Sequence, residues 1–180
     1  TNNNPNGVGS ATAYVQTDVS AVQMKRAQVK ALGGGFGGVT ANDTIEDAQI
    51  TFSSAFAFDF DPSDGIGAGL IDFVGVAVHE LMHAMGFTSG VDVLDFNSPG
   101  NGPFDDFEFD PFATVLDFTR VSANSVNAGA DMDWTASNLA KDYSIDGGTT
   151  TLISNAWSLG VIHGDGRQAS HWKDGLGIGI

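Results

Sequence analysis

The sequence contains no cysteine, which excludes a disulfide framework and metal sites built from thiolates. Basic residues are also scarce: 7 Lys and Arg stand against 22 Asp and Glu, for a formal net charge of −15. Nucleic acids and anionic membranes require a basic face on a protein partner, so we expect neither as a partner. No apolar run approaches the ~20 residues of a membrane span, and we therefore expect no membrane-spanning segment.

Glutamate is scarce too, with 3 copies against 19 aspartates. Aspartate favours turns, helix caps and oxygen cages for hard cations, whereas glutamate favours helix interiors. The aspartate excess therefore predicts a loop-rich protein and leaves two readings open, calcium sites or a solvated acidic surface. With 180 residues, 42% of them hydrophobic, the chain is long enough to bury a core, and we expect one domain or one domain with two lobes.

Several patterns in the first half of the chain indicate regular structure. Residues 14–19 could form a short strand, and residues 20–32 look helical, with Ser20 as a cap and a glycine run from Gly33 as a stop and flexible connection. Residues 48–60 alternate between apolar and polar side chains, which predicts a strand with one buried face. That strand would be either an ordinary core strand or the edge of a cleft that pairs with an extended substrate.

The second half of the chain is richer in turn signals. Residues 87–117 consist of turn residues and Asp-Phe pairs, and residues 146–148 are a further turn. Residues 114–121 are compatible with a helix or a strand, and residues 150–154 look like a short strand. We therefore expect this half to be built mainly from loops.

The clearest chemical signal is the stretch VAVHELMHAMGFTSG, residues 76–90. It contains the pattern HExxH at His79, Glu80 and His83. The flanking residues predict a helix that is capped by Asp72 and runs to about Met85, with Gly86 as its stop. A chance match to HExxH in a chain of this length is expected on the order of one time in a hundred or less. The stretch therefore predicts a zinc site rather than an ordinary buried helix.

The spacing of the motif explains its chemistry. Positions i and i+4 of a helix lie one turn apart on one face, so His79 and His83 can both direct a ring nitrogen at one zinc ion. Glu80 is the next residue round the helix and is placed to take a proton from a water activated by that zinc. The same carboxyl would later deliver the proton to the leaving amine of a cleaved peptide.

A catalytic zinc site needs a third protein ligand, which the motif does not contain. In the pattern HExxHxxGxxH, a glycine turns the chain so that a third histidine arrives three residues later. Gly86 matches this glycine, but Ser89 stands at the ligand position and is a very poor zinc ligand. A glutamate on a following helix is the other common solution, yet Glu108 is the only downstream glutamate and lies in the non-helical setting DDFEFDPF.

The sequence contains only two further histidines, His163 and His171. His171 is flanked by turn-prone residues and by a tryptophan that could pack beneath it. The residues alone favour His171 as the third ligand and leave His163 open. A carboxylate such as that of Asp92 or Asp174 remains a further alternative.

Two segments resemble the leishmanolysin-like branch of the metzincin proteases, and bacterial members in particular. They are HELMHAMGF, residues 79–87, and the distant ASHWKD, residues 169–174. In that branch an insertion separates the motif helix from the third histidine, which sits in a short S/A-H-W/F segment. The resemblance extends over roughly residues 45–180 and implies that His171 is the third zinc ligand. It also implies a zinc-dependent endopeptidase that acts on protein or peptide substrates.

The resemblance implies an α+β fold for a single catalytic domain over residues 1–180. An N-terminal lobe of about 1–86 would hold a twisted mixed sheet and the motif helix, and a loop-rich C-terminal lobe of about 87–180 would supply the third histidine. Metzincins carry a methionine turn after that histidine, but this sequence has no methionine after Met132. We expect the natural chain to continue past Ile180 to such a turn. The polar N-terminus shows no signal peptide, and the resemblance favours a secreted protein whose signal has been removed.

Two other functions remain open at this point. The first is a non-catalytic zinc module, closed by a fourth ligand such as His163 or an aspartate. The second is an acidic, calcium-dependent extracellular module in which HExxH is incidental. The aspartates considered as calcium ligands are Asp59, Asp61, Asp64, Asp92, Asp95, Asp105 and Asp106. Tyr143 is a candidate for stabilising an oxyanion, although a packing role is the simpler interpretation.

Overall fold

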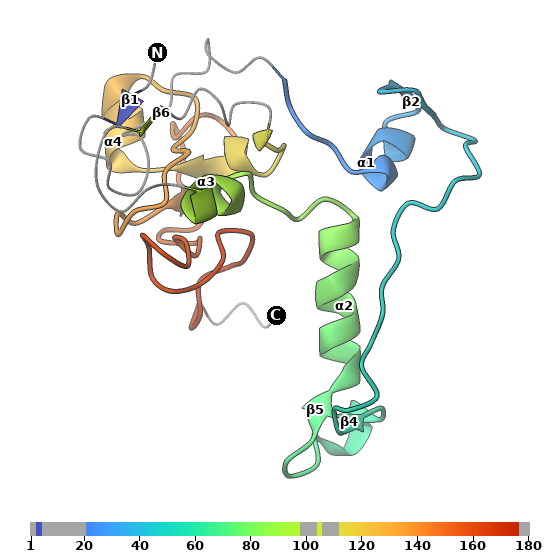
Figure 1. Ribbon diagram of the computed structural model, residues 1–180. Helices are drawn as coiled ribbons and strands as arrows, with labels where there is room; N and C mark the ends of the chain where they lie inside the picture. Colours follow the sequence, from blue (N-terminus) through green and yellow to red (C-terminus); the bar gives the residue numbers. More distant parts are fainter. Residues whose placement is uncertain (1–2, 5–20, 98–103, 106–111, 177–180) are drawn as a thin grey trace. The chain divides into compact units, whose positions relative to one another are not determined.

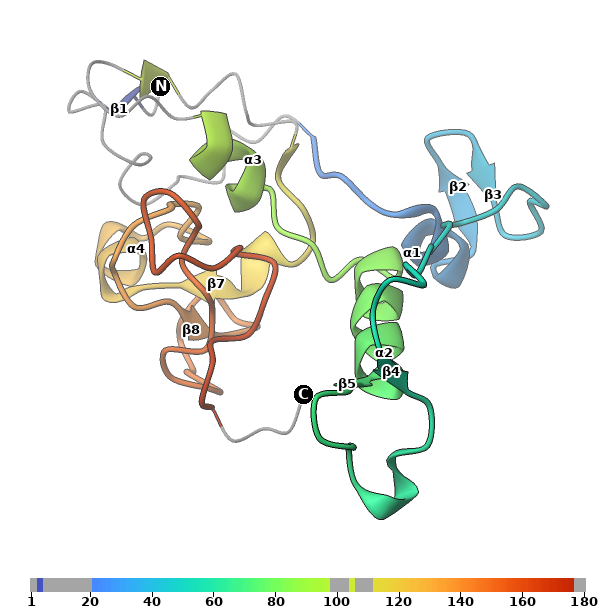
Figure 2. The same ribbon diagram turned by 60° about the horizontal axis from the view of Figure 1, so that its bottom comes forward.

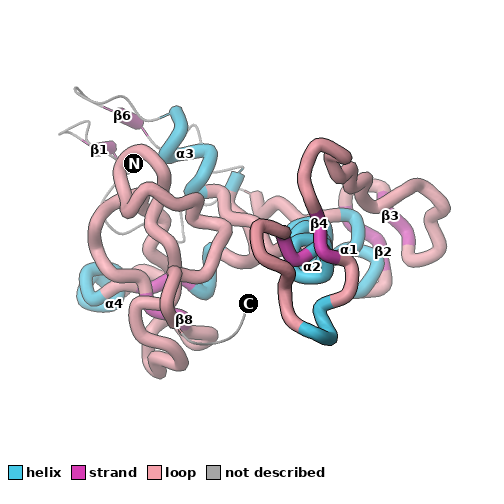
Figure 3. Tube along the Cα trace, turned by 90° about the horizontal axis from the view of Figure 1, so that it is seen from below, coloured by secondary structure: helices cyan, strands magenta, loops and turns pink. Residues whose placement is uncertain are grey.

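The computed structural model describes residues 3–4, 21–97, 104–105 and 112–176 (Figure 1). The chain divides into two compact units, which are described separately. The helix unit is Lys25–Phe87, and the loop unit comprises the remaining described residues, namely 3–4, 21–24, 88–97, 104–105 and 112–176. The described part of the whole chain is a small mixed α/β protein with four α-helices and short two-stranded sheets, joined by long loops (Figure 3).

The helix unit starts with a short helix and a hairpin. Its elements are α1 (Arg26–Ala31), β2 (Gly34–Phe36) and β3 (Val39–Thr40), and the antiparallel β2–β3 pair lies beside α1 (Figure 2). The predicted helix over 20–32 is therefore shorter at its start, and its expected cap, like the predicted strand at 14–19, lies outside the described residues. The glycine run forms part of this hairpin instead of a flexible connection. Gly34 has φ +78°, and a side chain there would meet the backbone of Thr40.

The predicted strand over 48–60 is wrong for most of its length. Only β4 (Phe58–Asp59) is a strand, and it pairs in parallel with β5 (Ile71–Asp72). The alternating phenylalanines instead form an aromatic cluster at the start of the motif helix. The rings of Phe52, Phe58 and Phe60 lie 4.9, 5.4 and 4.7 Å from that of Phe73. A period of two thus reflects ring packing here, because no strand of the described chain pairs with residues 50–57.

The motif helix α2 spans Phe73–Ala84, as the sequence predicts. The expected cap residue, Asp72, occupies the N-cap position with extended backbone, but its side chain makes no capping hydrogen bond. Residues Pro62–Asp64 form a short 3₁₀ helix. Figure 1 shows β4 and β5 next to the N-terminal end of α2. His79 and His83 lie in the C-terminal half of α2.

The loop unit contains the hydrophobic core. Its elements are α3 (Val91–Asn97), β7 (Arg120–Val121), α4 (Ala123–Ala128), β8 (Asp142–Tyr143) and the pair β1 (Asn3–Asn4) with β6 (Phe104–Asp105). The fully buried core consists of Val91, Leu94, Ala113, Met132, Trp134, Ala136 and Ala169. Helix α3 was not predicted, because it lies in a segment that is rich in turn residues. Residues 114–121 contain both a 3₁₀ turn and a strand, whereas residues 150–154 contribute only an isolated bridge, from Ile153 to Tyr143.

Buried charges link the loops of this unit. Asp117, Arg120, Asp133 and Lys141 are all buried. The Asp117 carboxylate accepts hydrogen bonds from the backbone nitrogens of Gly90 and Thr114, at 2.9 and 2.7 Å. Burial raises the pKa of Asp117 and lowers the pKa values of Arg120 and Lys141. Asp117 and Asp133 therefore do not belong to a solvated acidic surface. The buried carboxylate of Asp117 stabilises the neighbouring loops through its hydrogen bonds.

The extended sheet that the resemblance implies is not found in the part of the chain that the structure describes. All sheets there are two-stranded, with three antiparallel pairs and one parallel pair. Among the described helices, none has both the length and the apolar character needed to cross a lipid bilayer.

Candidate metal centre

The two motif histidines face each other on α2. Their Nε2 atoms are 3.1 Å apart, and their rings meet edge to face with centroids separated by 4.7 Å. Two nitrogens that bind one tetrahedral zinc ion at ~2.0–2.1 Å lie roughly 3.3 Å apart. His79 and His83 are therefore arranged as the helical pair of ligands that the sequence predicts. Glu80, on the same turn, is partly buried.

The end of α2 is shaped by a glycine. Gly86 has φ +107°, donates its N–H to the His83 carbonyl at 3.1 Å, and is followed by Phe87, whose N–H reaches the Met82 carbonyl at 2.9 Å. These two bonds form a Schellman motif, in which a left-handed residue closes the helix. A side chain at Gly86 would also meet the side chain of Gln28. The backbone conformation is the stronger reason for glycine here, because the end of the Gln28 side chain can move aside whereas the φ angle cannot change without opening the turn.

This turn orients one of the motif histidines. Because the chain reverses at Gly86, the carbonyl oxygen of Phe87 lies 2.6 Å from Nδ1 of His83. A carbonyl only accepts, so Nδ1 carries the proton and donates, which leaves Nε2 with its lone pair for a metal. Metal-binding histidines commonly have such a second-shell partner, which fixes both the tautomer and the ring orientation.

We expect Gly86→Ala to lower zinc affinity roughly tenfold or more, because the displaced Phe87 carbonyl would release the His83 ring. Gly129→Ala is a matched control, since Gly129 ends α4 with φ +70° and has open space around it. Both variants should lose about 1–2 kcal/mol of unfolding free energy from the left-handed backbone. Chelator competition measures the zinc affinity, and equal affinities in the two variants would contradict this role for the turn.

The third candidate, His171, belongs to the loop unit and is partly buried. Its Nδ1 lies 3.3 Å from the carbonyl oxygen of Gln168, and its own carbonyl accepts the N–H of Ser158 at 3.0 Å. The ring of His171 thus has the same kind of support as that of His83, with Nδ1 held by a backbone carbonyl. Such a contact favours the tautomer that carries its proton on Nδ1.

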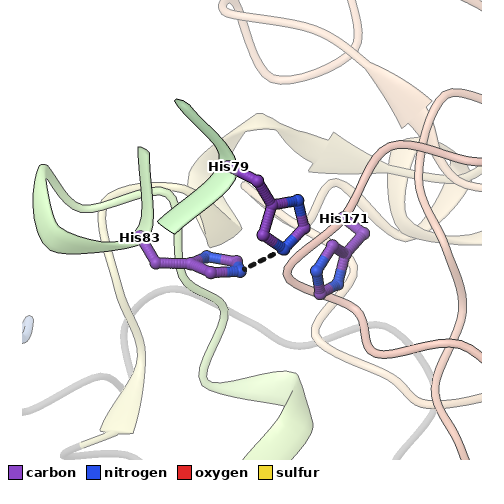
Figure 4. Close-up of side chains that lie close together, drawn as sticks. All are labelled: His79, His83 and His171. Carbon is purple, nitrogen blue, oxygen red and sulfur yellow. Dashed lines mark hydrogen bonds between the residues drawn. The ribbon is translucent and has the colours of Figure 1, made fainter. Parts of the chain in front are cut away.

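His79, His83 and His171 lie close enough together to hold a metal ion. One candidate ligand atom from each lies within 4.8 Å of the other two, and Figure 4 shows the three rings side by side. All three offer imidazole nitrogen, a ligand that suits zinc and several other transition metals. The donor set is therefore compatible with the zinc site that the sequence predicts, and the geometry does not distinguish among these metals.

The competing third ligands have other contacts. The backbone N–H of His163 donates to the Asp95 carboxylate at 2.9 Å, and His163 does not belong to the histidine group. Asp174 is well exposed and forms an ion pair of 3.0 Å with Arg167. Asp92 binds backbone groups of a neighbouring loop. These carboxylates do not join a group of three or more metal-binding side chains within the described residues.

Ser89, which stands where the HExxHxxGxxH pattern has its third histidine, has a structural role that the sequence analysis did not predict. It is buried, and its Oγ accepts the N–H of Val91 at 3.2 Å at the start of α3. The same hydroxyl donates to the buried carboxylate of Asp117. A serine just before an apolar run is an ordinary capping signal, so the sequence did contain the clue to α3.

The proposed calcium ligands also have local partners. The carboxylate of Asp59 accepts the N–H groups of Asp61 and Gly67, and that of Asp61 accepts the N–H of Ser63. These bonds lower the pKa values of both carboxyls. Asp106 and Glu108 lie outside the described residues, and Asp105 is described only as part of β6. Tyr143 packs edge-on against Trp157 and Trp172, as the packing interpretation predicts.

The family resemblance depends on few residues. It rests on the motif helix and on the segment around His171, whose histidines the structure places close together. The structure adds the orientation of two of these rings and the contacts of their neighbours. Comparisons with protein-family models, with curated proteins and with solved structures found no match for this chain.

Proposed function

We propose that the protein is a zinc-dependent endopeptidase of the metzincin type, with His79, His83 and His171 as the zinc ligands. The observation that carries this proposal is the grouping of these three histidines, two from one helical turn and one from a distant loop. Three protein ligands with one open position are the usual arrangement of a catalytic zinc site, whereas structural sites are closed by four.

The residues of the site have distinct tasks in this proposal. When bound, zinc would polarise the scissile carbonyl and make a water acidic enough to lose a proton near neutral pH. Glu80 would take that proton as general base and return it to the leaving amine as general acid. The carbonyls of Phe87 and Gln168 would hold Nδ1 of His83 and His171, so that each Nε2 stays directed at the metal.

The substrate in this proposal is a protein or peptide, and the enzyme itself is secreted. The net charge of −15 disfavours acidic substrates, because like charges repel during approach. The two-lobed metzincin fold belongs to the same proposal. Calcium is not needed for the chemistry.

Glu80→Gln tests the proposed reaction. Glutamine keeps the size of the side chain but cannot accept the proton, so we expect hydrolysis of a fluorogenic casein substrate to fall by about 10²–10⁴-fold. Zinc content should stay at that of the wild type, because Glu80 is not a ligand. Glu46→Gln, which removes the same charge from an exposed position of the helix unit, should leave the rate unchanged.

Each protein must be loaded with zinc and assayed for metal content before the rates are compared. No hydrolysis by the zinc-loaded wild type, or full activity in Glu80→Gln, would overturn the proposed function. Loss of activity in Glu46→Gln to the same extent would remove the specific role of Glu80.

A further inference from the structure

The loop that carries His171 is bound on one side by a carboxylate from α3. Asp92 accepts the backbone N–H groups of Ala169 and Ser170 at 2.6 and 3.1 Å, and also the hydroxyl of Ser170. One side chain thus fixes two consecutive peptide groups and one hydroxyl immediately before the histidine. Hydrogen bonds to an ionised acceptor are shorter and roughly twice as strong as neutral ones.

Further contacts hold the same loop. Ser170 Oγ accepts the backbone N–H of Ser89 at 2.8 Å, and Nη1 of Arg120 donates to the Ala169 carbonyl at 3.0 Å. Ser89, Ser170 and Arg120 are all buried, so these bonds are shielded from water. Ala169 and Ser170, the two residues before His171, are therefore restrained by polar contacts.

On the C-terminal side, the restraint is aromatic. The ring of Trp172 stacks on that of Trp157, with centroids 4.2 Å apart and planes inclined by 11°. The N–H of Lys173 donates to the Ala156 carbonyl at 2.7 Å. His171 therefore lies between two restrained neighbours, Ser170 and Trp172.

We propose that Asp92 and Ser170 are positioning residues that place His171 for metal binding, an inference that rests on the proposed function. Asp92 was a candidate ligand in the sequence, but both of its carboxylate oxygens accept protein donors. It acts on the metal through the loop that it holds. The Asp92 carboxylate fixes the backbone just before His171, from which the His171 side chain extends, while the Gln168 carbonyl orients the ring itself.

The chain contains a matched comparison on the same helix. Asp95 of α3 accepts the backbone N–H groups of Ile162 and His163, each at 2.9 Å. It therefore holds a second histidine-bearing loop in the same manner, and that histidine is not part of the metal-binding group. Loss of either carboxylate removes comparable hydrogen bonds, but only the loss of Asp92 disturbs the loop of His171.

The experiment compares Asp92→Ala, Asp92→Asn and Ser170→Ala with Asp95→Ala in the full chain. Zinc affinity is measured by chelator competition, coordination by the visible absorption of the cobalt(II)-loaded protein, and unfolding by urea. We expect Asp92→Ala to bind zinc about 10–100-fold more weakly and to change the cobalt spectrum. Asp92→Asn and Ser170→Ala should show the same changes to a smaller extent, because each retains some of the hydrogen bonds.

Asp95→Ala should unfold at lower urea concentration yet keep the zinc affinity and cobalt spectrum of the wild type. If all the folded variants bind zinc like the wild type, or if Asp95→Ala weakens zinc binding as much as Asp92→Ala, the positioning role is overturned. Asp92→Asn provides the readout where Asp92→Ala fails to fold. Failure of the wild type itself to bind zinc would instead overturn the proposed function, and the positioning role with it.

Discussion

The variant His171→Ala is expected to lose zinc affinity by more than the ~10–100-fold that removal of a second-shell contact costs. The variant removes one of the three proposed ligands, whereas His163→Ala removes a histidine that lies outside the group. His163→Ala should therefore bind zinc like the wild type. This pair decides between the two histidines that the residues alone left open.

Competition with a zinc chelator of known affinity gives the dissociation constants, and urea unfolding checks that both variants are folded. The expected loss has a direct physical cause, because a two-histidine site has two open positions and holds zinc less firmly. Unchanged affinity in His171→Ala would contradict the assignment of the third ligand. An equal loss of zinc affinity in His163→Ala would indicate that His163 and His171 both bind the metal.

The largest expected effect on stability comes from a buried ion pair in the loop unit. Nζ of Lys141 lies 3.4 Å from a carboxylate oxygen of Asp133, and the two side chains are 0% and 1% exposed. Asp133→Ala would leave the ammonium of Lys141 buried without its counter-charge. We expect a loss of about 3–5 kcal/mol in the free energy of unfolding, measured by urea denaturation.

The exposed pair Arg167–Asp174 provides the control for that variant. Its side chains are 67% and 77% exposed, so Asp174→Ala should change the free energy of unfolding by less than about 1 kcal/mol. Combining Asp133→Ala with Lys141→Met should recover part of the loss, since both charges are then removed. A loss in Asp133→Ala no larger than that in Asp174→Ala would contradict a stabilising role for the buried pair.

The motif helix could be predicted from sequence because its signals are local. These signals are the aspartate at the N-cap position, the i, i+4 spacing of the histidines and the glycine stop at Gly86, and all lie within one or two turns of the helix. The structure confirms the helix and its end. The choice of His171 needed non-local information, which the resemblance and the small number of histidines supplied.

The failures of sequence reasoning have a common physical origin in long-range contacts. Residues 48–60 alternate as a strand does, yet the rings of Phe52, Phe58 and Phe60 pack on Phe73 across a turn. Propensity describes what a segment can form, and tertiary packing decides what it does form.

The roles of Ser89 and Asp92 were missed for a related reason. Both were considered as zinc ligands, and their actual partners lie far along the chain, at Asp117 for the serine and at Ala169 and Ser170 for the aspartate. Spacing within the sequence cannot reveal such pairs. The contribution of the Phe87 carbonyl was equally hidden, because a backbone acceptor leaves no mark in side-chain identity.

The proposed function depends on one claim, that this chain holds a catalytic zinc site with three histidine ligands. A crystal structure of the zinc-loaded protein tests it most directly, with the metal identified by anomalous scattering at the zinc edge. We expect zinc bound by nitrogens of His79, His83 and His171, with a water at the fourth position. Four protein ligands, with His163 or an aspartate closing the site, or zinc that does not contact His171, would contradict the claim.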